Sequence, residues 1–187
     1  MKNKRRLSVA GRKAAALVIM AIVLILLIGF ITLAIDVGYV ALTKTSMQAV
    51  ADSATLSGGT ELKSSLGRNP AAASTMRATA TALAVDYASR HANGDVTSTY
   101  LSPDDDVRFG WAKFNNDTGA WDLNWGSELP SVGGHNLIGV IVHRDREGSE
   151  NADKPLPLIF ARVLGNDFSN LQTKASAVIM PAKGIRI

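Results

Sequence analysis

The chain contains no cysteine, few aromatic residues and only three histidines. Without cysteine it forms no disulfide, offers no thiolate ligand to a metal and has no cysteine nucleophile. A nucleophile elbow, a P-loop and a paired-histidine zinc motif are also missing from the sequence. An enzyme built on this chain, such as an envelope hydrolase, has to use His91, His135 or His143 together with acidic residues. The sequence therefore favours a protein that is not an enzyme and needs no cofactor.

Two sets of residues are candidates for holding a metal ion. His135 and His143 are eight positions apart, which puts them on one face of a regular strand, but the expected strand begins near Asn136. Residues 104–106 are three consecutive aspartates after Pro103, and their carboxylates suit calcium. No further ligand spacing accompanies these aspartates. We expect surface histidines and a solvated acidic turn, with no metal site.

Basic residues are scarce beyond the start of the chain. Residues 1–13 hold six of the 20 lysine and arginine residues, so the remainder carries 14 basic and 16 acidic residues, a net charge of −2 against +4 for the whole chain. The basic balance therefore belongs to the N-terminal segment. Nucleic-acid binding requires basic residues clustered on the folded part of a protein. We expect no nucleic-acid partner.

Residues 14–35 form a run of 22 residues without a charged side chain. At about 1.5 Å per helical residue this run reaches roughly 33 Å, enough to cross a hydrocarbon core of about 30 Å. The basic residues precede the run, and only Lys44 follows within the next twenty residues. The positive-inside rule then predicts a single-pass membrane protein with a cytoplasmic N-terminus and an extracytoplasmic remainder.

Two kinds of processing remain as alternatives to this anchor. Cleavage near Ala34 would release a secreted or surface-exposed binding module, although a signal h-region is usually only about 7 to 15 residues long. Cleavage after Gly11 would give a minor pilin. Arg12 would then be the first residue and Ala16 the fifth, so the charge usual at the fifth position of a pilin is missing. An uncleaved anchor is the favoured interpretation.

Two helices are expected beyond the span. Residues 36–59 lack proline and are rich in helix formers, so the membrane helix is predicted to continue to Gly58-Gly59. Its apolar stripe is available either to the chain's own core or to a neighbouring subunit, and it consists of Thr43, Met47, Val50 and Ala54. A second helix is predicted from Asn69-Pro70 to Asn93-Gly94. Its expected buried face contains Met76, Ala80, Leu83 and Tyr87.

The later part of the chain alternates between apolar and polar residues and predicts antiparallel strands. The alternating sets are Val107, Phe109 and Trp111, then Trp121, Leu123 and Trp125, then Ile138, Val140 and Val142, and last Ala175, Ala177 and Ile179. Residues 115–119 provide a hairpin turn between the first two sets. Leu156 to Leu164 is expected to be a short helix, and Gly148 to Pro155 a surface loop. The three tryptophans are expected in the core, with an exposed aromatic platform as the alternative.

The sequence thus predicts an α+β protein with a pilin-like architecture. Its parts are a basic cytoplasmic segment (1–13), a transmembrane helix (14–35), a helix extension (36–59) and an extracytoplasmic domain with an antiparallel sheet (60–187). The last part, roughly 125 residues, is long enough for a hydrophobic core of its own.

The residues at the membrane exit form a specific pattern. Asp36 and Gly38 close the apolar run, and the residues that follow about ten positions later are Gln48, Ala51, Asp52, Ala54 and Leu56. This pattern resembles the N-terminal region of the TadG-like proteins of Flp pilus assembly, over roughly residues 11 to 60. Ser53 and Thr55 stand where the family usually has alanine. No Asp-x-Ser-x-Ser motif is present, so the resemblance is to a small member without a von Willebrand factor A domain.

This resemblance implies a bacterial inner-membrane component of Flp pilus assembly or of Tad-type secretion, connected with surface adherence. Such a protein acts structurally, and its implied partners are the membrane and other pilus-assembly or pilin-like proteins, with self-association as a further option. The candidate contacts are Thr43, Met47, Val50, Trp111, Trp121 and Trp125. Asp36 lies at the edge of the hydrocarbon, where an acid must reach water or find a partner. It either marks the membrane exit or binds a partner.

Overall fold

The computed structural model describes residues 4–65, 70–128 and 134–180. The chain divides into two compact units. The first combines the chain up to Tyr39 with Leu158–Asp167, and the second combines Val40–Pro157 with the chain from Phe168 onward.

The dominant element is α1 (Lys4–Gly59), an α-helix of 56 residues that contributes to both units. It is followed by the 3-10 helix η1 (Thr60–Ser65). The predicted continuation of the span helix to Gly58-Gly59 is therefore confirmed. Every large apolar side chain from Leu17 to Ile35 is exposed, by 44% to 70%. Among the described residues, α1 is the one helix long and apolar enough to cross a membrane.

The second helix, α2 (Pro70–Ser89), begins where it was predicted and ends five residues before Gly94. The proposed N-cap, Asn69, lies outside the described residues. The predicted buried face is only half right, because Leu83 is intermediate and Tyr87 is 41% exposed. The face that is buried is made almost wholly of small residues: Ala73, Met76, Ala80, Ala84 and Ala88.

Small residues line this face because α2 packs closely on the end of α1. A Cβ added to Gly58 would lie 2.9 Å from the carbonyl oxygen of Ala80 and 3.4 Å from the Cβ of Ala84. The hydroxyl of Ser57 also reaches the carbonyl oxygen of Leu83, at 3.4 Å. Larger side chains would force the two helices apart, so the alanine spacing and not the bulkier residues decides which face is buried.

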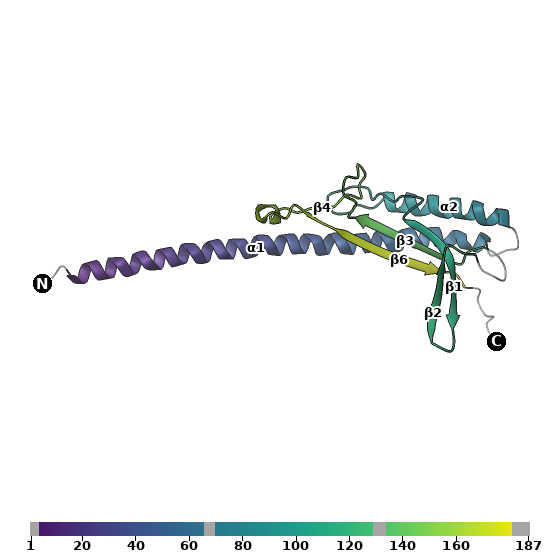
Figure 1. Cartoon of the computed structure of the whole chain (residues 1–187). Helices are drawn as coiled ribbons and strands as arrows, with labels where there is room; N and C mark the ends of the chain where they lie inside the picture. Colours follow the sequence, from purple (N-terminus) through teal and green to yellow (C-terminus); the bar gives the residue numbers. More distant parts are fainter. Residues whose placement is uncertain (1–3, 66–69, 129–133, 181–187) are drawn as a thin grey trace. The chain divides into compact units, whose positions relative to one another are not determined.

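Four strands form an antiparallel sheet in the order β2-β1-β3-β6 (Figure 1). Their bounds are β1 (Val107–Asn115), β2 (Ala120–Trp125), β3 (Leu137–Arg144) and β6 (Leu171–Val178). The predicted hairpin and both later strands are confirmed. A separate two-stranded ribbon pairs β4 (Leu156–Pro157) with β5 (Phe168–Ser169), and the 3-10 helix η2 (Ala161–Leu164) lies between these two strands in the chain.

The predicted helix from Leu156 to Leu164 is therefore wrong over most of its length. Pro157 has no N–H and disfavours helical conformation in Leu156 before it, so those residues pair as a strand. Only the last four residues are helical, and Gly165 ends them in a left-handed conformation with a φ of 87°.

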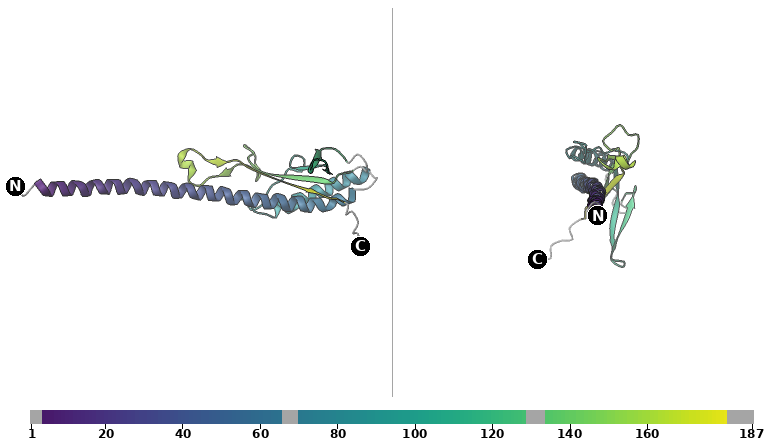
Figure 2. Two further views of the ribbon diagram at one scale, coloured as in Figure 1. Left: turned by 90° about the horizontal axis from the view of Figure 1, so that it is seen from below. Right: turned by 90° about the vertical axis from the view of Figure 1, so that its left-hand side faces the viewer.

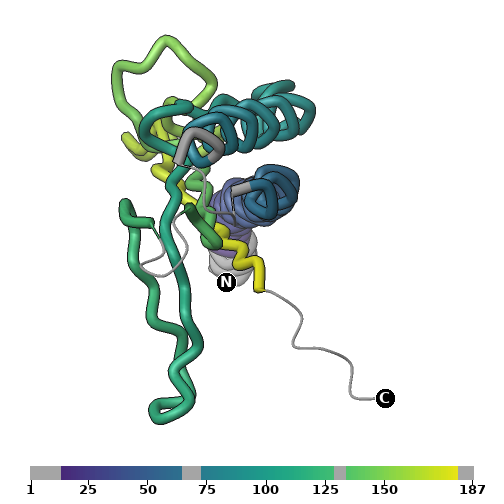
Figure 3. The backbone as a smooth tube through the Cα atoms, turned by 90° about the vertical axis from the view of Figure 1, so that its right-hand side faces the viewer, coloured from purple at the N-terminus to yellow at the C-terminus, as the bar shows by residue number. Residues whose placement is uncertain are grey.

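The core of the second unit lies between the sheet and two helices. Figure 3 shows α2 and the last turns of α1 side by side against one face of the sheet. The α1 stripe faces this core: Thr43, Met47, Val50 and Ala54 are each at most 1% exposed. The stripe therefore packs in the chain's own core, which is one of the two alternatives that the sequence allows. The α+β class, with a long apolar N-terminal helix and a small antiparallel sheet, is confirmed.

Candidate functional site

Asp36 has a specific partner inside the first unit. Its carboxylate accepts three consecutive backbone N–H groups, from Ile159, Phe160 and Ala161, at N···O distances of 2.9, 3.0 and 2.5 Å. The side chain is buried, with 3% of its surface exposed. The N–H groups of the two residues before the 3-10 helix η2 and of its first residue converge on one charged acceptor, an arrangement that holds the loop firmly against α1. We name residues 158–167 the η2 loop.

The remaining pattern residues lie further along α1. Gln48 donates its side-chain amide to the carboxylate of Asp52 at 3.0 Å and to the carbonyl oxygen of Lys174 at 3.2 Å, so this pair ties α1 to strand β6. Gly38 has open space around its missing Cβ, and Leu56 is 65% exposed. Thus Gln48 and Asp52 make polar contacts within the chain, Ala51 and Ala54 are buried, and Gly38 and Leu56 are free of close packing in it.

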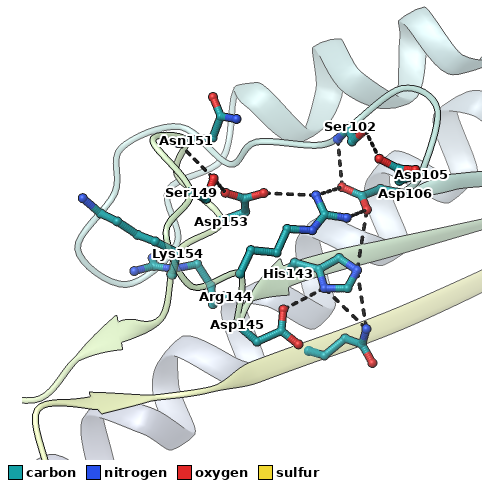
Figure 4. A network of polar contacts seen from close by, with 12 residues as sticks. Ser102, Asp105, Asp106, His143, Arg144, Asp145, Ser149, Asn151, Asp153 and Lys154 are labelled. Carbon is teal, nitrogen blue, oxygen red and sulfur yellow. Dashed lines mark hydrogen bonds and ion pairs between the residues drawn. The ribbon is translucent and has the colours of Figure 1, made fainter.

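A polar network joins three segments of the second unit (Figure 4). The guanidinium of Arg146 binds the carboxylates of Asp106 and Asp153. Asp106 is fully buried and also accepts the backbone N–H of Ser102 at 2.8 Å. Burial lowers the pKa of Arg146, but hydrogen bonds and attraction to the two aspartates outweigh it and raise that pKa. Asp106 is therefore neutralised by an arginine, and of the predicted acidic turn only Asp104 and Asp105 are exposed.

Arg144, at the end of β3, forms a second buried ion pair. Its side chain is 0% exposed and bonds to the carboxylate of Asp95 at 2.5 Å. It also donates to the backbone carbonyl oxygens of Asn93 and Lys154, each at 2.8 Å. The arginine thus connects the loop after α2 with the loop before β4. No sequence pattern indicated this role, because its acceptors lie 10 to 51 positions away.

The histidines do not come together. His135 lies before β3 and is 2% exposed, whereas His143 lies near the other end of that strand. The His143 ring contacts Asp145 at 2.7 Å and Asp106 at 3.5 Å. The side-chain amide of Gln172 also lies 3.4 Å from the ring, and none of these three partners is a hydroxyl or a thiol. In residues 4–65, 70–128 and 134–180 no group of three His, Asp or Glu side chains is placed to hold a metal.

The three tryptophans do not share one face, so the exposed aromatic platform, which was the alternative to core packing, does not contain all three. Trp111 pairs with Asn124, and Trp121 and Trp125 pair with Phe114 and Gly110. Since directly paired residues lie on one face of a sheet, Trp111 points to the opposite face from the other two.

The face with two tryptophans carries an apolar cluster, and the sequence-based expectation that these rings lie in the core is wrong. Exposed fractions range from 38% to 50% for the four residues that we name the aromatic stripe: Phe114, Trp121, Leu123 and Trp125. The Phe114 and Trp121 rings meet edge to face, with centroids 5.4 Å apart. The stripe stays exposed because the strand register puts it on the face of the sheet opposite Ile138 and Ala177, which lie against Gly58 and Gly59 of α1. The hairpin also projects away from the helices (Figure 2).

Comparison with known proteins gives a family match over the segment that includes the apolar run, Asp36 and the Gln48–Asp52 pair. Residues 14–64 match the model of the putative Flp pilus-assembly TadE/G-like family. The resemblance predicted from the sequence is confirmed over this TadE/G-like segment, which connects the chain with Flp pilus assembly. No curated protein and no solved structure matches the chain significantly.

The TadE/G-like segment and the apolar helix together indicate membrane association. Proteins of this family are generally structural, and no feature of the described residues indicates catalysis. The β-rich part, from Val107 to Val178, lies outside the matched residues.

Proposed function

We propose that this protein is a single-pass inner-membrane component of Flp pilus assembly or Tad-type secretion that acts through protein contacts. The observation that carries the proposal is the coincidence of the TadE/G-like match with the exposed apolar run of α1, which ends just before Asp36. Exposing the apolar side chains of this 22-residue run to water is unfavourable, and the hydrocarbon core of a bilayer would cover them.

The proposed topology follows the charge distribution. Residues 1–13 are cytoplasmic, 14–35 span the membrane, 36–59 extend the helix outward, and 60–187 form the extracytoplasmic domain. The family suggests a bacterial envelope as the setting. The buried stripe residues Thr43, Met47 and Val50 contribute by fixing the domain on α1, and the partner surface lies elsewhere.

The aromatic stripe is the surface that we propose for contact with other pilus-assembly or pilin-like proteins, including a second copy of this chain. Interfaces are enriched in tryptophan, and exposed side chains of this kind lose water when a partner covers them. An aromatic cluster on a projecting hairpin is also accessible without disturbing the core. Trp111, on the other face, is left out of this surface.

Complementation of a strain that lacks the protein tests the proposal. The double variant Trp121→Ser and Leu123→Ser is expected to remain in the membrane after a carbonate wash and to lose pilus assembly. The matched control is Lys113→Ser, an exposed residue of the same hairpin on the opposite face. Normal piliation by the stripe variant would contradict the contact surface.

The state of the wild-type protein tests the anchor separately. A full-length chain is expected in the washed membrane fraction. A soluble chain that begins near Ile35 would favour a secreted binding module, whose exposed aromatic stripe would then serve a different partner. A chain beginning at Arg12 would indicate a processed minor pilin.

A further inference from the structure

The η2 loop presents more apolar surface than its length requires. Four of its ten residues have large apolar side chains that are exposed. The exposed fractions are 53% for Ile159, 37% for Phe160, 85% for Val163 and 75% for Leu164. Scattered exposed apolar residues are common in proteins, but a contiguous set on one short loop marks a contact surface.

The position of the loop along α1 shows what this surface meets. A groove of about 250 Å³ is lined by Gly29 and Leu33 of α1 and by Phe160, Val163 and Leu164 of the loop. Gly29 and Leu33 belong to the apolar run 14–35. Six helical rises separate Gly29 from Ile35, so the groove reaches roughly 9 Å below the end of the span. Amphipathic elements at a membrane surface bury to a similar depth, about 5–10 Å.

The backbone of the loop is suited to an apolar solvent. Irregular backbone is costly in lipid unless its polar groups are satisfied within the protein. Asp36 accepts the N–H groups of residues 159–161. Backbone carbonyl oxygens of the same loop accept four more: Leu158 donates to Asp167, Val163 to Phe160, Gly165 to Arg162 and Asn166 to Ala161, at 2.9 to 3.1 Å.

The charges of the loop also fit a membrane surface. The positive charge of Arg162 acts on the Asp36 carboxylate, which compensates a buried acid at the edge of the span. The Nε of Arg162 donates to the carbonyl oxygen of Leu158 at 3.1 Å, and the side chain is otherwise exposed. A long cationic side chain at this level reaches headgroup phosphates while its stem stays in apolar surroundings.

We infer that the η2 loop inserts Phe160, Val163 and Leu164 into the outer leaflet and attaches the chain to the lipid a second time. Asp36 acts as the positioning residue that fixes the loop against the span. The occupant of the surface is lipid, because the exposed side chains line the same groove as span residues that the bilayer surrounds. This inference rests on the proposed function, since it requires that residues 14–35 cross the membrane.

Single-cysteine variants provide the test, because the wild-type chain has no cysteine that competes for the label. Val163→Cys, Leu24→Cys and Thr118→Cys are each labelled with an environment-sensitive fluorophore in the full-length protein. The proteins are reconstituted in phosphatidylethanolamine and phosphatidylglycerol vesicles that contain a nitroxide-labelled lipid. Leu24 reports the span, and Thr118, in the exposed hairpin turn, reports water.

We expect a blue shift and quenching by the nitroxide lipid at positions 24 and 163, and quenching by aqueous iodide alone at 118. Iodide quenching alone at 163, with 24 quenched by lipid, would overturn the inference and leave the proposed anchor intact. Protection of 163 from both quenchers would overturn it in favour of contact with another protein copy. Absence of lipid quenching at 24 would refute the span and the inference together.

The role of Asp36 is tested in the same vesicles. Asn has one acceptor oxygen and no charge, so Asp36→Asn holds the three N–H groups of the loop less firmly. Combined with Val163→Cys, this change is expected to reduce lipid quenching at 163. Combined with Leu24→Cys, it is expected to leave quenching at 24 unchanged. Equal quenching at 163 with and without the substitution would refute the positioning role.

Discussion

Replacing Arg144 by methionine tests whether buried electrostatics hold the second unit together. Methionine keeps most of the apolar stem of the side chain and removes the guanidinium. The change leaves the Asp95 carboxylate without its partner and deprives the carbonyl oxygens of Asn93 and Lys154 of a donor. All three acceptors lie in loops, so those loops lose their connection to the end of β3.

The expected cost follows from the exposure of each group. Breaking a fully buried ion pair costs about 3–5 kcal/mol. Asp95 is 32% exposed and regains water, which places this case at the lower end. The two carbonyl oxygens each lose a hydrogen bond to a charged donor, worth about 1.5 kcal/mol or more. We therefore expect Arg144→Met to lower the free energy of unfolding by about 3 to 6 kcal/mol, from the ion pair alone up to the full sum with both carbonyl contacts.

Arg90→Met is the matched control. Arg90 bonds to Asp86 at 2.6 Å, nearly the same distance as in the Arg144 pair, but the two side chains are 64% and 48% exposed. Surface pairs one helical turn apart contribute only about 0.3–0.5 kcal/mol. If bond length and not burial determined the cost, the two variants would lose equal stability.

Urea unfolding of the full-length protein in detergent micelles measures both variants. The chain's three tryptophans all lie in the β1–β2 hairpin, so their fluorescence reports the sheet and not the membrane helix. A loss for Arg144→Met no larger than that for Arg90→Met would refute the reasoning. The additional variant Asp95→Ala, alone and combined with Arg144→Met, separates the ion pair from the two carbonyl contacts.

Two further predictions concern a close helix contact and a buried histidine. Gly58→Ala is expected to lower the free energy of unfolding by about 1–3 kcal/mol, because the new Cβ would lie 2.7 Å from Ile138 Cδ1 and 2.9 Å from the Ala80 carbonyl oxygen. Gly38→Ala, with no atom within 4 Å of its Cβ, is the control and is expected to lose no stability in the same unfolding assay; equal losses would contradict the packing argument. Burial lowers the pKa of His135 below its usual 6.5, so the unfolded chain binds a proton first and the free energy of unfolding falls as the pH drops through 6.5. Unfolding at a series of pH values should show a smaller decrease for His135→Gln, and identical decreases would count against this assignment.

Much of the fold could be predicted from local sequence patterns. The helix that continues past the span, the start of α2 and the hairpin each depend on residues close together in the chain. The prediction failed where distant contacts decide. Leu83 and Tyr87 are apolar and correctly spaced, yet close approach to Gly58 favours the alanine face of α2.

The candidate site was also predictable from the sequence only in part. Asp36 was recognisable as unusual, because an acid that ends an apolar run is rare and costly. Its partners were not recognisable, because they are backbone N–H groups more than 120 positions later in the chain. Backbone groups carry no residue-specific signal. The tryptophans were predicted as a set from their alternation, but the register of β1 on β2 put Trp111 on the opposite face.

By itself, the sequence determined the membrane-compatible helix, the basic segment before it and the TadE/G-like pattern, because length, charge and spacing along one helix are local properties. Only the tertiary structure decided that the stripe of Met47 and Val50 is core, that Arg144 and Arg146 hold the loops, and that Asp36 fixes the η2 loop against α1. Those outcomes depend on which distant groups come within hydrogen-bond or van der Waals distance, and chain folding alone determines that.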